Sequence, residues 1–235
     1  MKKFFCLTWI FIFIMSATVF AEENFRTISV SGEGIVETSP DRATISVGVV
    51  SRDKDASKVQ SESARTATEI INSVVALGVE RKNIRTGNYN FRQVTRTNDK
   101  GKRFFDGYEV TNSVTIVVDD IKIVGKVIDA ALSHGANKVD SLQFGLRDKK
   151  NFQLEAIQLA TRDARAKAEL VARELGRSII GVRSVSVNST SISSPRSSKM
   201  MLDYVGGPME ENFETPIESG NLTCSASVSI DFEIN

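Results

Sequence analysis

Histidine and cysteine are nearly missing from this chain of 235 residues, and neither sign of charge prevails in it. A single histidine, His134, gives no basis for a histidine-dependent catalytic triad or a histidine-rich metal site. The formal net charge of +1 gives no strong overall field that would attract nucleic acid or anionic lipid. The sequence therefore predicts no catalytic residues, no metal site and no nucleic-acid partner.

The N-terminus has the parts of an export signal. Lys2 and Lys3 precede an apolar run over residues 4–15, and Ala21 ends a short stretch that contains small residues. The apolar run is shorter than the roughly 20 residues that a membrane-spanning helix needs. We therefore predict a signal peptide over residues 1–21, cleaved after Ala21. The mature chain is then periplasmic or secreted, with no integral membrane segment.

Hydrophobic periodicity predicts the order of the elements. Alternating patterns predict strands at residues 25–34, 42–50, 84–94, 104–118, 139–146, 179–187 and 222–234. Helical spacing predicts amphipathic helices at 55–77, from 119 or 120 to 135, and 148–176. The order ββα-ββα-βα-ββ predicts an α+β fold, in which a mixed or antiparallel sheet is backed by three helices. The apolar stripe of the third helix is expected to include Phe152, Ala156, Leu159, Leu170, Val171 and Leu175.

The stretch Gly32-Glu33-Gly34 belongs either to a ligand-binding loop or to a turn. A dinucleotide fingerprint needs a third glycine and a following helix, whereas here a strand follows. Glu33 would also repel a pyrophosphate. We therefore predict that Gly32 and Gly34 form a turn or bulge, together with the turn residues Pro40 and Asp41, and that no cofactor binds there.

The remaining candidate residues have structural interpretations. His134 precedes Gly135 at a predicted helix end and is expected to cap it. Asp119 and Asp120 are adjacent, which favours a helix cap over an acid–base pair. Cys224 is the only cysteine beyond the signal peptide, and it lies on the apolar side of the final strand, so we expect it in the core. A Ser-Lys or two-carboxylate mechanism stays open, although no spacing singles out a pair.

Residues 188–221 differ in composition from the rest of the chain. Serines dominate the first part, and methionines, glycines and acidic residues follow. Such a segment buries little apolar surface, which predicts a mobile insertion in a single domain over residues 22–235. Its methionines, Met200, Met201 and Met209, are candidates for oxidation if they are exposed.

Four stretches together point to a family. They are ISVSGEGIVETSPDRATISVGVVS near the mature start, LGVERKNIRTGNYN, FDGYEVTNSVTIVV, and the alanine-rich ATRDARAKAELVARELG. In these stretches the chain resembles the SIMPL domain family of exported bacterial proteins, which includes YggE-like proteins and a periplasmic immunogen. The resemblance covers most of residues 25–190 and the final strand.

The resemblance implies an exported α+β protein with no assigned enzymatic activity and no catalytic residues to carry over. Some family members are linked to protection from oxidative stress, and the immunogen resembles a ring-shaped or channel-like oligomer. Our hypothesis is a non-catalytic homo-oligomer that supports envelope integrity or oxidative-stress tolerance, with an unidentified envelope partner. One alternative is a monomeric binding module for a small ligand or envelope partner, with segment 188–221 as its lid. The other is a hydrolase that uses an unrecognised serine or carboxylate.

Overall fold

The computed structural model describes residues 26–193 and 215–235. The elements of this part are β1 (Thr27–Thr38), β2 (Arg42–Asp53), α1 (Ala56–Ala76), η1 (Arg81–Asn83), β3 (Ile84–Thr97), β4 (Arg103–Val118), η2 (Ile121–Ile123), α2 (Val124–Ser133), β5 (Lys138–Gly145), α3 (Lys150–Glu174), β6 (Ile179–Ser193) and β7 (Leu222–Ile234). The predicted α+β fold and the order of its strands and helices are confirmed. The predicted signal peptide and the three methionines lie outside the described residues.

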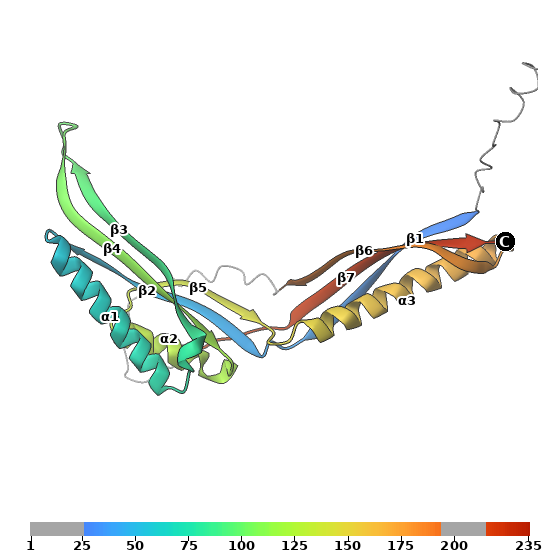
Figure 1. The fold of residues 1–235 in the computed structure, drawn as a ribbon, viewed down its shortest axis with the longest axis horizontal. Coiled ribbons are helices and arrows are strands. Elements are labelled where there is room, and N and C mark those ends of the chain that lie inside the picture. The colour runs from blue at the N-terminus through green and yellow to red at the C-terminus, as the bar shows by residue number, and fades with distance from the viewer. Residues whose placement is uncertain (1–25, 194–214) are drawn as a thin grey trace, which may run out of the picture.

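The strands divide between two antiparallel sheets and do not form the one sheet expected from the sequence. Strands β3, β4, β2 and β5 form a four-stranded sheet, and β1, β7 and β6 form a three-stranded sheet. Figure 1 shows them in two lobes that extend in different directions from a shared junction. We call these the α1–α2 lobe and the α3 lobe, after the helices that cover their sheets.

The α1–α2 lobe has a conventional aliphatic core. Asp55 caps α1 by accepting hydrogen bonds from the backbone N–H groups of Ser57 and Lys58 at 2.8 and 3.1 Å. The buried face of α1 then presents residues at helical spacing to the sheet: Val59, Ala67, Ile70 and Val74. Helix α2 adds Val124, Val127, Ile128 and Ala131 to the same core. The predicted amphipathic helix at 55–77 therefore turns its apolar face to the sheet.

Helix α3 packs through small side chains. Its buried residues are the alanines that recur every fourth position: Ala156, Ala160, Ala164, Ala168 and Ala172. Leu170, Val171 and Leu175, which the sequence placed on the buried stripe, are exposed instead. The row of methyl groups, and not the larger aliphatic residues, meets the sheet because it lets the helix backbone come close to β1.

Gly32 and Gly34 lie inside strand β1, and this corrects the prediction that they form a turn or bulge. The β1–β7 pairing runs without a register shift from Thr27 opposite Glu233 to Thr38 opposite Leu222. A Cβ atom on Gly32 would lie 2.0 Å from the carbonyl oxygen of Ala160, and one on Gly34 would lie 2.0 Å from that of Ala156. The two glycines therefore allow close helix–strand packing.

The predicted turn residues Pro40 and Asp41 lie where the chain passes from one lobe to the other. Pro40 is buried between the ends of β1 and β2. Asp41 donates its backbone N–H to the carbonyl of Gly145 at 3.2 Å, and its carboxylate accepts the backbone N–H of Arg147 at 2.7 Å. These two bonds tie the β1–β2 crossing to the second crossing, from β5 to α3.

Candidate functional site

Strand β6 presents an apolar face that α3 does not cover. Val182, Val185 and Val187 pair with Phe232, Ile230 and Val228 of β7, all of which are buried against α3. The three β6 valines lie on the same sheet face but are 54%, 59% and 51% exposed. Strand β6 is also the sheet edge, so its outer side lacks a neighbouring strand in the described structure. An apolar sheet surface thus stays open to solvent.

Strand β6 contains three bulges, and the one between Val182 and Val185 keeps these valines on one face. The β6–β7 register shifts between Ile179 and Gly181, between Val182 and Ser184, and between Val187 and Ser189. Each shift inserts one residue and resets the alternation of side chains. The strand therefore lacks a regular period of two in its sequence. For this reason the sequence predicted a strand at 179–187 but did not predict its exposed apolar face. It also did not predict that β6 extends to Ser193.

A groove of about 530 Å³ lies between β6 and α3. Ile230 and Phe232 form its floor, and β6 residues from Ile179 to Val185 form one wall. The other wall consists of Thr161, Arg165 and Glu169, each one position after a buried alanine. Arg165 and Glu169 form an ion pair at 2.8 Å on this wall. The groove combines an apolar floor with a charged rim, which suits apolar side chains or a small apolar ligand.

The groove exists because α3 is drawn towards β1. The alanine row and the two glycines let helix and strand approach closely, and α3 packs mainly on β1 and β7. The ammonium group of Lys167 donates to the carbonyl of Ser31 at 3.1 Å, and the Glu33 N–H donates to Asp163 at 2.9 Å. These contacts fix the helix on the β1 side, so that β6 is left uncovered.

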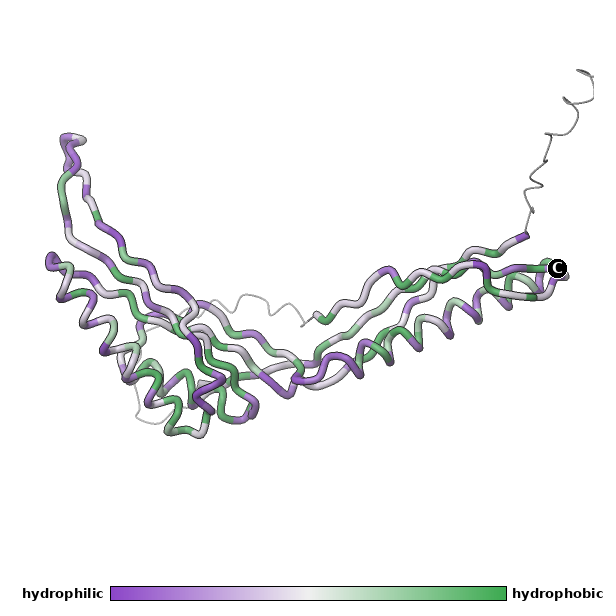
Figure 2. Tube along the Cα trace, in the orientation of Figure 1, coloured by the Kyte–Doolittle hydropathy of each residue, from purple (hydrophilic) through white to green (hydrophobic). Residues whose placement is uncertain are grey.

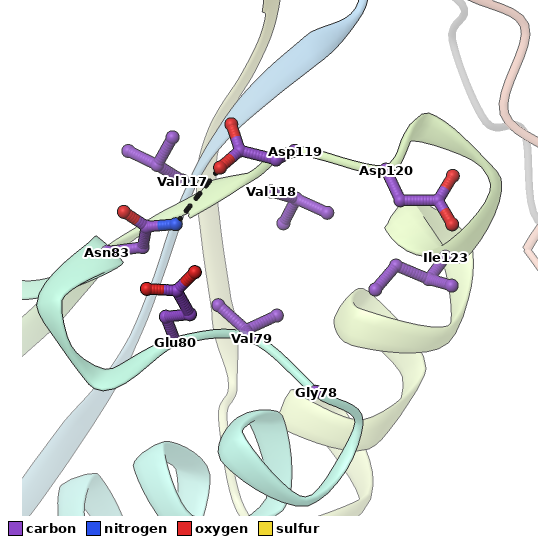
Figure 3. Close-up of a pocket in the computed structure, with 9 residues that line it drawn as sticks. All are labelled: Gly78, Val79, Glu80, Asn83, Val117, Val118, Asp119, Asp120 and Ile123. Atoms are coloured by element: carbon purple, nitrogen blue, oxygen red, sulfur yellow. Dashed lines mark hydrogen bonds between the residues drawn. The ribbon is translucent and has the colours of Figure 1, made fainter.

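A second hollow, of about 210 Å³, lies at the end of the α1–α2 lobe, and Figure 3 shows its lining residues. The Asp119 carboxylate accepts hydrogen bonds from Arg42 at 2.7 Å and from Asn83 at 3.3 Å, and Arg147 lies 3.7 Å away. Burial opposes ionisation of Asp119, but the hydrogen bond and charge of Arg42, with the charge of Arg147, lower its pKa overall. Such a carboxylate is ionised near neutral pH and is unsuited to act as a general acid.

The neighbouring carboxylates of this hollow do not form a catalytic pair with Asp119. Asp120 points away from Asp119 in Figure 3, and it accepts the backbone N–H of Lys122 at 3.0 Å. It therefore caps η2, as the sequence favoured. Glu80 pairs with Lys82 at 2.5 Å. The carboxylates of Asp119 and Glu80 in this hollow are therefore engaged in ion pairs.

Glu109 is the most buried carboxylate of the described residues, at 4% exposure. It lies on β4 between Arg92 of β3 and Arg52 of β2, and it forms ion pairs with both. The hydrogen bond from Arg92 and that from Arg52 lower the pKa of Glu109, although burial acts in the opposite direction. The three side chains therefore link three strands of the sheet.

The other residues singled out from the sequence have structural positions. His134 is the C-cap residue of α2, as predicted, and its Nδ1 lies 2.8 Å from the Ala130 carbonyl oxygen. Cys224 is buried in the core of the α3 lobe, and burial raises the pKa of its thiol. Across residues 26–193 and 215–235, no three His, Cys, Asp or Glu side chains are grouped so as to hold a metal ion.

Fold and surface together define the class of this protein: a two-lobed α+β protein with an apolar groove at a sheet edge. No helix within the described ranges has the length and apolar character to cross a membrane. The chain belongs to the SIMPL family, described as "Protein of unknown function (DUF541)", which matches residues 28–232. The family membership suggested by the four sequence stretches is thereby confirmed.

Several relatives are similar over most of their length. The 26 kDa periplasmic immunogenic protein of Brucella melitensis is 26% identical over 234 residues, which is 93% of this chain and 91% of that protein. The uncharacterized protein YggE of Edwardsiella ictaluri is 25% identical, with 73% of this chain and 72% of that protein covered. YggE of Escherichia coli K12 is 23% identical, with 80% and 76% covered.

Proposed function

We propose that this chain is an exported, non-catalytic protein that self-associates through the α3–β6 groove and supports the bacterial envelope or its tolerance of oxidative stress. The observation that carries the self-association is the uncovered apolar face of β6, with Val182, Val185 and Val187 each more than half exposed. Contiguous apolar surface of this kind usually marks a contact site. A relative named a periplasmic immunogenic protein supports the compartment.

A second copy of the chain offers side chains that suit the groove. Leu154 and Leu170 are exposed on α3 and lie two positions from the alanine row, which places them on the helix face that points away from the sheet. Leu175 is exposed at the end of the same helix. Since groove and leucine face are different surfaces, the contact between copies is heterologous, and its repetition gives a ring or a filament.

The energetics favour a closed assembly over an isolated dimer. Burying the exposed halves of the three β6 valines contributes about 1 kcal/mol each. Association costs about 4–15 kcal/mol in lost rigid-body freedom, so that one groove gives only a weak pair. In a ring each subunit uses both its groove and its leucine face, and the last contact forms at a high effective concentration. Assembly is therefore expected to be cooperative.

Light scattering on the exported chain tests this proposal. We expect a multiple of the monomer mass for the wild type, and the monomer mass for V182S/V185S, since both valines are more than half exposed and tolerate serine. The matched control is Ile35→Ser, because Ile35 is similarly exposed on the opposite face of the same sheet. A monomeric wild type would refute self-association, and an unchanged V182S/V185S assembly would exclude the groove as the contact.

A monomeric binding module is the second candidate, and the size of the groove favours it. Its volume of about 530 Å³ is within the range of small-molecule sites, roughly 300–1,000 Å³. Native mass spectrometry distinguishes the two functions. A monomer that retains an apolar small molecule, and loses it in V182S/V185S, would support the binding module against the assembly.

The physiological part of the proposal rests on the family resemblance and has its own test. A strain that lacks this protein should survive peroxide less well than its parent, and the wild-type gene should restore survival. The assembly-deficient V182S/V185S variant should fail to restore it, whereas Ile35→Ser should succeed. Equal survival of the parent and the deletion strain would remove the oxidative-stress role.

A further inference from the structure

The β3–β4 hairpin projects beyond the rest of the α1–α2 lobe. Strand β2 pairs with β4 only as far as Tyr108, so residues from Arg103 to Gly107 pair with β3 alone. The hairpin closes through the turn at Asn98–Lys102, in which the Asn98 side chain accepts the backbone N–H groups of Lys100 and Lys102. Figure 1 shows this tip extending past α1 and the end of β2.

Aromatic side chains gather just below the tip. Phe91 stacks on Tyr108 with a centroid separation of 5.4 Å, and Phe105 meets Tyr108 edge-on at 5.2 Å. Phe91, Phe104 and Phe105 nevertheless remain 41%, 44% and 44% exposed. Because Phe104 and Phe105 are consecutive in β4, they point to opposite faces of the hairpin. Each face of the projecting end therefore carries an exposed phenylalanine, and Phe91 and Phe105 share the face of Tyr108.

The same hairpin carries a local excess of positive charge that the near-neutral net charge hides. Between Ile84 and Tyr108 the basic residues are Arg85, Arg92, Arg96, Lys100, Lys102 and Arg103, and the acidic residues are Asp99 and Asp106. Arg92 pairs with Glu109, and Arg96 pairs with Asp106 at 3.3 Å. Within the described ranges, no ion pair involves the cations nearest the turn, Lys100, Lys102 and Arg103.

Charge and apolar surface lie side by side along the projecting hairpin, so that a hairpin lying on its side brings both to the surface of a bilayer. In Figure 2 the turn is a hydrophilic tip with an apolar stretch directly below it. Phenylalanine has no group that could form hydrogen bonds with a sugar or a peptide. Its transfer into the region between headgroups and acyl chains is favourable. Cations beside it are attracted by anionic headgroups and fall within a Debye length of them.

We propose that the β3–β4 hairpin docks this protein on membranes that contain anionic phospholipids. The hairpin lies on its side, so that the face that carries Phe91 and Phe105 enters the interface, and Lys100, Lys102 and Arg103 at the adjoining turn contact the phosphate groups. The contact is peripheral and reversible, and it does not depend on the groove in the other lobe. An anionic bilayer surface is then the envelope component that this chain binds.

Vesicle co-flotation tests the proposal with the exported chain. We expect binding to vesicles of phosphatidylcholine and phosphatidylglycerol at 3:1, little binding to phosphatidylcholine alone, and weaker binding as salt rises. Each tip cation contributes about fivefold to the binding constant, so that K100Q/K102Q/R103Q should lose about 100-fold. F91S/F105S should lose at least tenfold even at low salt.

Matched controls separate the hairpin from general effects. K150Q/R162Q/R177Q removes the same charge from exposed positions of the α3 lobe, and I35S/L132S removes exposed apolar side chains elsewhere; both should bind like the wild type. Circular dichroism confirms that each variant is folded. Equal binding to neutral vesicles, or full binding by both tip variants, would overturn the proposal. So would tighter binding to dextran sulfate that displaces the vesicles, because an anionic polymer would then be the ligand.

Discussion

Replacing Gly32 or Gly34 with alanine should loosen the whole α3 lobe. The added Cβ at residue 32 would lie 2.0 Å from the Ala160 carbonyl oxygen and 2.6 Å from the Ala164 nitrogen. At residue 34 the corresponding distances, to the Ala156 oxygen and the Ala160 nitrogen, are 2.0 and 2.5 Å. Ordinary carbon–oxygen contacts are at about 3.3–3.6 Å. Because all these atoms belong to backbone, the helix must move by more than about 1 Å.

The expected loss of stability follows from that movement. Five alanines lie buried along the interface, and a gap of about 1 Å removes about half of each contact, which is about 1–2 kcal/mol for the row. The bonds from Lys167 to Ser31 and from Glu33 to Asp163 weaken as well, by about 1 kcal/mol together. Alanine restricts the unfolded chain and returns about 0.5–1 kcal/mol. The net loss is about 2 kcal/mol for either variant.

Urea unfolding followed by circular dichroism measures this loss at constant m-value. Gly145→Ala is the matched control, because Gly145 also lies in a strand but a Cβ there has no neighbour within 4 Å. The double variant G32A/G34A should cost less than the sum of the single changes, since one displacement of α3 relieves both clashes. If both single variants stay within about 0.5 kcal/mol of the wild type, the close helix–strand approach is refuted.

Two further predictions concern buried groups. Replacing Glu109 with glutamine should lower stability by about 1–2 kcal/mol at pH 7, a figure reduced by the exposure of both arginines. Because the pKa of Glu109 is lowered by folding, its contribution is present above the ordinary glutamate pKa of 4.5 and is lost as the pH falls through the folded value. The difference between wild type and variant, measured by urea unfolding, should therefore shrink at pH 3; an equal difference at pH 7 and pH 3 would contradict the electrostatic role. Cys224 should not react with a disulfide reagent in the folded chain, because it is buried and its thiol pKa is raised, and should react only in urea. Rapid labelling without denaturant would contradict this, because it would show that the reagent reaches the thiol in folded β7.

The sequence was most informative where a single element decides the outcome. Helix α1 lies within the predicted range 55–77 and turns one apolar face to the sheet, since periodicity depends on neighbours a few positions away. The parity of β7 correctly predicted that Cys224 is buried. His134 and Asp120 cap their helices as expected, for the same local reason.

The sequence was misleading where a partner distant in the chain decides. Leu170, Val171 and Leu175 were expected on the apolar stripe of α3 together with Ala156, but the glycines of β1 select the alanine row. Gly32 and Gly34 were expected in a turn for a related reason, because a glycine that admits a helix backbone looks in sequence like one that admits a turn. The bulge between Val182 and Ser184 concealed the apolar face of β6, because it breaks the period of two among the valines.

The sequence by itself determined the α+β class, the order of strands and helices, and the family. These depend on local periodicity and on motifs of consecutive residues. Only the tertiary structure decided that the strands form two sheets, that α3 covers β1 and β7, and that a groove stays open beside β6. Strand pairing joins residues as far apart as Thr27 and Glu233, and alternation in one strand does not specify its partner. The projecting hairpin is another such result, because the length over which β2 accompanies β4 is set by pairing and leaves the aromatic, basic tip uncovered.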